Sequence, residues 1–164
     1  MNRYHLLSMT KVVLVFMLMT FYLGSYAQSA EDKGLTIAKE RKLRDSGWGD
    51  SIGEMSMILR NTQGDEVERE MRLKLLENSD DGDKVLTIFE QPLDVKGTAF
   101  LSFSHRIEPD DQWMYLPKLS KVKRIRSRNK SGPFMGSEFA FEDMSYFEIE
   151  KYKFRYLRDV TFDG

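Results

Sequence analysis

MSMILRNTQGDEVEREMRLKL, residues 55–75, contains the pattern that decides the fold. Apolar side chains recur at odd positions from Met55 to Leu59 and again from Val67 to Leu75, while the even positions of the second run are charged. A period of two is typical of a strand with one buried face, and the polar residues 61–65 between the runs are typical of a turn. The stretch therefore predicts a hairpin of two half-buried strands.

The same alternation of strand and turn continues along the chain. We predict further strands over residues 85–89, 98–105, 112–116 and 119–125, separated by turns at 78–83, 92–97 and 109–111. Before the hairpin, Ser29 and Asp32 form a capping signal for an amphipathic helix that ends before Gly47. Consecutive strands joined by short turns form an antiparallel meander, which curls when it is large. The predicted fold class is α+β, dominated by a curved antiparallel sheet.

The last residues show one more strand-like pattern. Tyr152, Phe154 and Tyr156 alternate with basic residues, and the chain ends on Asp163 and Gly164, a dipeptide that commonly starts a hairpin. A hairpin signal with no returning strand leads us to expect that residues 28–164 are a domain truncated at its C-terminus, with further strands in a longer protein.

The first residues resemble an export signal. Residues 1–11 carry positive charge only, residues 12–23 are almost entirely apolar, and Ser25 and Ala27 provide the small residues that a signal peptidase recognises. We expect a cleavable signal peptide over residues 1–27, with cleavage after Ala30 as the second choice, and a periplasmic product. The alternative is a membrane anchor, which needs about 20 apolar residues.

The residues that are scarce exclude several classes of site. The chain has no cysteine, which excludes disulfides, thiolate metal sites and a cysteine nucleophile. His105 is the only histidine after residue 27, which excludes a metal site built on several imidazoles. A hydrolase would need His105 with Ser102 or Ser104, and their closeness in sequence does not by itself create a catalytic geometry. We therefore expect no enzyme activity, no cofactor and no metal, and we interpret the acidic residues at 80–83 as a solvated turn.

A basic run is the strongest local charge feature. Seven Lys or Arg side chains lie between Lys118 and Lys130, in a chain of formal net charge -1. An exported, acidic protein makes nucleic acid a poor candidate, which leaves a solvated face or a docking surface for an anionic membrane or partner. We expect docking through four bases and a following exposed loop. These residues are Lys121, Lys123, Arg124, Arg126, Phe134 and Met135.

Three segments together resemble a known family. DVKGTAFL (94–101), DDQWMYLPKLSKVKRI (110–125) and GPFMGSEFAFEDM (132–144) are similar to the outer-membrane lipoprotein-sorting proteins, the LolA-like periplasmic carriers. The resemblance implies an incomplete β-barrel covered by helices, which holds acyl chains of lipoproteins or lipids and delivers them toward the outer membrane. It also implies an inner-membrane exporter or an outer-membrane acceptor as partner.

The alternating apolar residues are the expected acyl contacts, since methionine in particular adapts to flexible chains. These candidates are Met55, Met57, Leu59, Met71, Leu73, Leu75, Leu101, Phe103 and Trp113. The alternative for these residues is an ordinary core. The alternative for the whole protein is an accessory component of an envelope export system that carries no lipid.

Overall fold

The architecture is one helix and one six-stranded sheet. The computed structural model describes residues 28–126 and 129–162, so the expected signal peptide lies outside the described residues. Helix α2 (Ala30–Arg44) precedes the strands β1 (Asp50–Arg60), β2 (Glu66–Leu76), β3 (Lys84–Gln91), β4 (Ala99–Phe103), β5 (Asp111–Leu116) and β6 (Lys121–Ile125). Short 3-10 helices follow at η1 (Pro117–Leu119), η3 (Phe134–Gly136), η4 (Phe141–Met144) and η5 (Ile149–Lys151).

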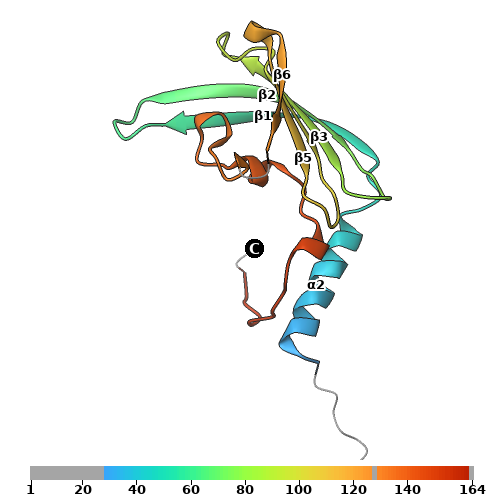
Figure 1. Cartoon of the computed structure of the whole chain (residues 1–164). Coiled ribbons are helices and arrows are strands. Elements are labelled where there is room, and N and C mark those ends of the chain that lie inside the picture. Colours follow the sequence, from blue (N-terminus) through green and yellow to red (C-terminus); the bar gives the residue numbers. More distant parts are fainter. Residues whose placement is uncertain (1–27, 127–128, 163–164) are drawn as a thin grey trace, which may run out of the picture.

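The sheet is an antiparallel meander with strand order β1-β2-β3-β4-β5-β6. It is strongly curved and does not close on itself (Figure 1), which confirms the α+β fold predicted from the sequence. The predicted hairpin is present with β1 and β2 paired along their whole length, from Asp50↔Leu76 to Arg60↔Glu66. The alternation read from residues 55–75 therefore gave this hairpin and its turn correctly.

Helix α2 begins where its cap was predicted. The Ser29 hydroxyl accepts a hydrogen bond from the Asp32 amide at 3.0 Å, which satisfies one of the free N–H groups of the first turn. The buried face of the helix is narrow, because Gly34 and Ala38 are buried whereas Leu43 is 70% exposed.

The predicted C-terminal strand is absent from the described residues. Residues 152–160 form no ladder and instead run along α2, where the Tyr156 amide donates to the Ala30 carbonyl at 2.8 Å. Their alternation has a different cause, because Phe154 packs against Phe147 while Arg155 faces Glu31. Gly34 permits this close approach, since a Cβ atom there would lie 2.8 Å from the Arg155 nitrogen.

The hydrophobic core lies on one face of the sheet, which we call the covered face. Its buried side chains come from β1 to β5, from the loop after β3 and from Phe134. They are Met57, Met71, Phe89, Val95, Phe100, Met114 and Phe134. Residues 129–151, which we call the covering segment, cross this face (Figure 1).

Candidate functional site: an apolar pocket on the covered face

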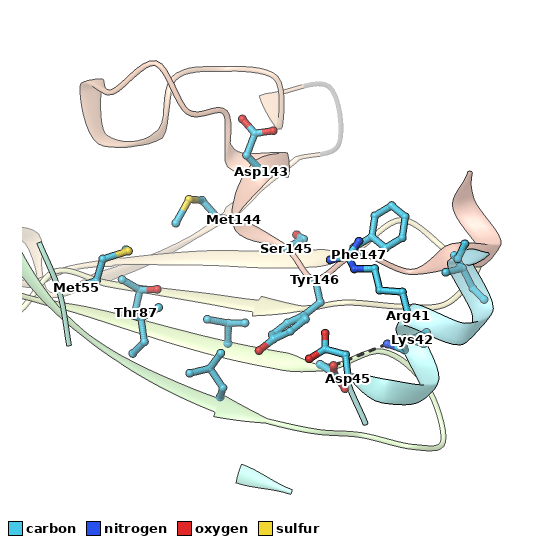
Figure 2. Close-up of a pocket in the computed structure, with 16 residues that line it drawn as sticks. Arg41, Lys42, Asp45, Met55, Thr87, Asp143, Met144, Ser145, Tyr146 and Phe147 are labelled. Atoms are coloured by element: carbon cyan, nitrogen blue, oxygen red, sulfur yellow. Dashed lines mark ion pairs between the residues drawn. The ribbon is translucent and has the colours of Figure 1, made fainter. Parts of the chain in front are cut away.

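A pocket of about 320 Å³ lies between α2, the covered face and the covering segment. Figure 2 shows Met55 and Thr87 projecting from the sheet, Arg41 and Lys42 from α2, and Met144 from the covering segment. Most of the remaining wall is apolar. These wall residues include Ala38, Leu73, Leu75, Val85, Phe147 and Ile149.

The strand register explains why these side chains meet. Leu73 is paired with Thr87, and Leu75 with Val85, so the pairs lie side by side on one face. Met55 pairs with Met71 and is placed on the same face. Since side chains two residues apart share a face, one register places a continuous apolar surface beneath α2.

The pocket has a polar rim. The Lys42 Nζ lies 3.3 Å from Glu148 Oε2 and 4.0 Å from Asp83 Oδ2, and Glu148 is only 1% exposed. The Arg41 guanidinium lies 5.2 Å above the Phe147 ring. Burial, and then the nearby Asp83 and Asp45, raise the pKa of Tyr146, so its hydroxyl stays neutral at this rim.

The expected acyl contacts divide into three groups. Met55, Leu73 and Leu75 line the pocket. Met57 and Met71 are buried in the core, and Leu59 packs against it. For these three the structure supports the alternative of an ordinary core, because Met57 and Met71 belong to the same buried cluster as Phe134 and Leu59 packs against that cluster.

The third group, Leu101, Phe103 and Trp113, lies on the opposite face. Phe100 and Met114 form the buried pair of β4 and β5, so their neighbours Leu101 and Trp113 point the other way. The expectation that these three side chains line the same cavity as Met55 is therefore wrong. The sequence did not reveal which residues face the core, because both faces of β4 and β5 are largely apolar. The buried polar residues Ser102 and Gln112 on the covered face make the alternation harder to recognise.

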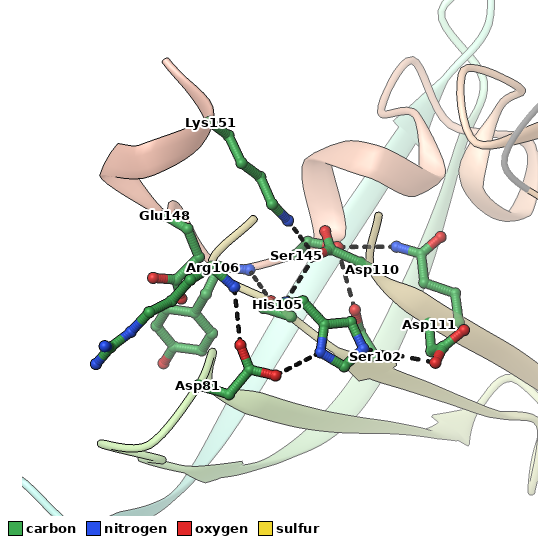
Figure 3. Close-up of polar contacts among 12 residues, drawn as sticks. Asp81, Ser102, His105, Arg106, Asp110, Asp111, Ser145, Glu148 and Lys151 are labelled. Carbon is green, nitrogen blue, oxygen red and sulfur yellow. Dashed lines mark hydrogen bonds and ion pairs between the residues drawn. The ribbon is translucent and has the colours of Figure 1, made fainter. Parts of the chain in front are cut away.

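A polar network that was missed in the sequence fixes the covering segment (Figure 3). The Gln112 amide donates to the Phe141 carbonyl at 2.7 Å and to the Ser145 hydroxyl at 2.9 Å. Ser145 is also 3.1 Å from the Ser102 hydroxyl, and the Tyr146 amide donates to Ser104 at 3.1 Å. The sequence signal for this network was the presence of polar residues at inward-facing positions of two neighbouring strands. Buried polar groups need hydrogen-bond partners, so such residues predict a segment that packs on them.

His105 belongs to an ion-pair network beside these serines. Its Nδ1 lies 2.6 Å from Asp81 Oδ2 and its Nε2 lies 3.5 Å from Asp111 Oδ2 (Figure 3). The Asp81 carboxylate, more than Asp111, raises the pKa of His105. Among the described residues no hydrogen bond joins His105 to Ser102 or Ser104, so the arrangement is not that of a nucleophile and its base. The described part of the chain also holds no group of three or more potential metal ligands.

The basic run does not form one uniform surface. Strand alternation places Lys121 and Lys123 on the side of Met114, and Arg124 on the side of Trp113, where it pairs with Asp111. Arg126 is exposed. Lys130 is only 8% exposed and donates to the Asp110 carbonyl, and burial lowers its pKa.

The loop after the basic run is not exposed as expected. Phe134 is fully buried between Phe89, Phe100 and Phe141, so the expectation that it touches a membrane or partner is wrong. Met135 is half-buried with a φ of 52°, and its carbonyl accepts a hydrogen bond from Arg69. The backbone of residues 134–136 turns the Phe134 ring toward the sheet, so this apolar sequence belongs to the core and not to the surface.

An open, curved antiparallel sheet with an apolar pocket between its covered face and a helix defines a class of half-barrel proteins. A crystal structure from Vibrio parahaemolyticus, assigned as an outer membrane lipoprotein-sorting protein domain, is 66% identical with a TM-score of 0.79 and covers 82% of this chain and 57% of its own. The chain belongs to this outer-membrane lipoprotein-sorting protein family.

Two further comparisons give matches. A DUF1329 family protein from Desulfovibrio piger ATCC 29098 is 30% identical with a TM-score of 0.68, over 76% of this chain and 53% of its own. A family model described as "Uncharacterized protein" matches residues 81–164. No curated protein matches the chain. The chain thus spans a little over half the length of both solved structures.

Proposed function

We propose that the protein is a non-enzymatic periplasmic carrier that binds an acyl chain of a lipoprotein or another lipid in the pocket beneath α2 and delivers it toward the outer membrane. The observation that carries this proposal is the pocket itself, with an apolar wall that includes Met55, Leu73 and Leu75 and a polar rim that includes Arg41 and Lys42. The assignment of the 66% identical Vibrio domain to lipoprotein sorting supports it.

The chemistry of the wall fits a flexible chain with a polar end. The methionines Met55 and Met144 adapt to irregular ligands, while Arg41, for which the described residues provide no ion-pair partner, is the base that would hold a carboxylate or a phosphate at the mouth. Ligand pockets usually measure about 300–1,000 Å³, and this one, at about 320 Å³, is at the small end of that range, which favours a single chain over a large lipid.

The energetics explain the need for a carrier. Burying one chain of about 16 carbons contributes about 12 kcal/mol before ordering costs are subtracted, at roughly 0.8 kcal/mol per methylene. The same favourable free energy would slow release of the acyl chain unless the pocket wall moves. α2 and the covering segment form most of the wall that the sheet does not supply, so these are the parts we expect to move.

The location follows from the same proposal. Residues 1–27 are the proposed signal peptide, and residues 28–164 are the proposed carrier domain. None of the helices in the described part of the chain is long and apolar enough to cross a membrane. Exporter and acceptor proteins of the envelope are the proposed partners.

Native mass spectrometry of the gently extracted full-length protein tests the carrier. We expect a co-purifying lipid, its loss in Leu73→Gln, and its retention in Leu101→Gln, because Leu73 lines the pocket whereas Leu101 is a half-buried leucine on the opposite face. Unchanged far-UV circular dichroism would show that both variants fold. Absence of lipid from the native protein, together with no uptake of a fluorescent fatty acid, would favour the accessory protein that carries no lipid.

A further inference from the structure

Two loops lie together at the end of the sheet away from α2 (Figure 1). One, residues 92–98, joins β3 to β4, and the other, residues 117–120, joins β5 to β6. They are in contact range, because a Cβ atom at Gly97 would lie 3.7 Å from the Pro117 Cγ atom. We call these loops and the adjoining start of β6, up to Lys123, the tip surface.

The tip surface exposes apolar side chains that nothing else in the described chain covers. Leu93 is 79% exposed, Leu119 is 67% exposed and Val122 is 61% exposed. They stand on loop ends and on an edge strand, so they do not form a groove. Isolated exposed leucines are ordinary, but a cluster on neighbouring loop tips marks an interaction site.

The same surface is basic. Lys96, Lys118, Lys121 and Lys123 are exposed, and none of them has an ion-pair partner among the described residues. Residues 92–98 and 117–123 contain only one acid, Asp94. Lysine is depleted at protein interfaces, whereas anionic lipid headgroups attract it. The combination therefore favours a membrane over a protein partner.

We propose that the tip surface docks the protein on an anionic lipid bilayer. Leu93 and Leu119 enter the interfacial layer while the lysine stems lie along it and their ammonium groups contact phosphate headgroups. This surface retains Lys121 and Lys123 from the basic run. Compared with the docking residues expected from the sequence, it excludes the buried Phe134 and the Asp111-paired Arg124, and it adds Leu93, Lys96, Lys118 and Leu119.

Docking and lipid carriage are separable in this structure. The pocket lies under α2 and the tip surface lies at the other end of the sheet (Figure 1), with no residue in common. Changes at the tip surface are therefore expected to alter membrane association and to leave lipid in the pocket. The proposal does not depend on the carrier function.

Co-sedimentation of the full-length protein with phosphatidylglycerol-containing vesicles and with pure phosphatidylcholine vesicles tests the docking. We expect binding to the anionic vesicles only, weakened by salt. Each base near an anionic surface contributes about fivefold to partitioning, so Lys118→Gln with Lys121→Gln should reduce it by up to about 25-fold and flatten its salt dependence.

The apolar contribution has a matched control. Leu93→Ser with Leu119→Ser should reduce partitioning roughly tenfold. Ile107→Ser with Leu43→Ser should leave it unchanged, because these residues are equally exposed, at 79% and 70%, and lie away from the tip. An equal loss of vesicle partitioning in the two double variants would overturn the proposal.

Insertion can be observed directly because the chain contains no cysteine. Leu119→Cys carrying an environment-sensitive dye should shift to the blue with anionic vesicles, and Ile107→Cys should not. Absence of vesicle binding by the unmodified protein, or capture by an acidic protein without vesicle binding, would overturn the proposal. Lipid content by mass spectrometry remains an independent readout of the pocket.

Discussion

Phe134→Ala distinguishes a core residue from a docking residue. The Phe134 ring is fully buried, with centroids 5.2 Å from Phe100, 5.5 Å from Phe141 and 6.1 Å from Phe89. Replacing such a ring by alanine removes its burial and leaves a cavity, which costs about 3–5 kcal/mol. With a typical urea dependence of about 2 kcal/mol per M, the unfolding midpoint should fall by about 1.5–2.5 M.

Phe139→Ala is the matched control, since Phe139 is in the same loop and 55% exposed. Its unfolding midpoint should stay close to that of the unmodified protein, within about 0.5 kcal/mol. Urea denaturation followed by circular dichroism measures both variants. Equal midpoints for the two variants, with vesicle binding lost only in Phe134→Ala, would refute the buried placement and restore the docking role.

Two other contacts give further predictions. Gly34→Ala would normally favour a helix by about 1 kcal/mol, but its Cβ would lie 2.8 Å from the Arg155 nitrogen, so we expect faster tryptic cleavage within residues 152–160. Gly53→Ala, which meets nothing within 4 Å, should not change the cleavage rate. His105→Gln removes a side chain whose pKa is raised by Asp81 and Asp111 from 6.5, so its stabilising effect is full below about pH 6.5 and is lost as pH rises through the folded value. The lowered pKa of Asp81 and Asp111 means that the effect is also lost below about pH 3.8. Thermal unfolding of both proteins should therefore differ most near pH 5 and least near pH 9, and an equal difference at both values would contradict this assignment.

The fold was largely predictable because its signals are local. Alternation in β1 and β2 is driven by one buried and one solvated face, and the turn at residues 61–65 has the expected polar composition. The C-terminal alternation at residues 152–156 was misleading, because a period of two shows only that alternate side chains are buried. Here Tyr152 and Phe154 contact Phe147 and Tyr156 lies against Lys33, although Tyr152 stays 55% exposed, and no strand pairing is involved.

The candidate site was only partly predictable. Met55, Leu73 and Leu75 follow from alternation, but the faces of Leu101 and Trp113 depend on a register that no local pattern fixes when both faces are apolar. The burial of Phe134 depends on a backbone turn at Met135, which is a tertiary feature. The polar rim of the pocket at Arg41 and Lys42 could not be predicted, because it depends on where α2 lies relative to the end of the sheet.

The position of the covering segment determines how much lipid the covered face could hold. Its middle is fixed by the buried Phe134 and by hydrogen bonds from Gln112, each worth about 1 kcal/mol. The part next to the pocket, from Tyr146 to Ile149, has fewer anchors, chiefly the Tyr146 amide on Ser104 and the Lys42–Glu148 pair. If a lipid needs more room than the present pocket, this part should move first, because none of its side chains belongs to the buried hydrophobic core that holds Phe134.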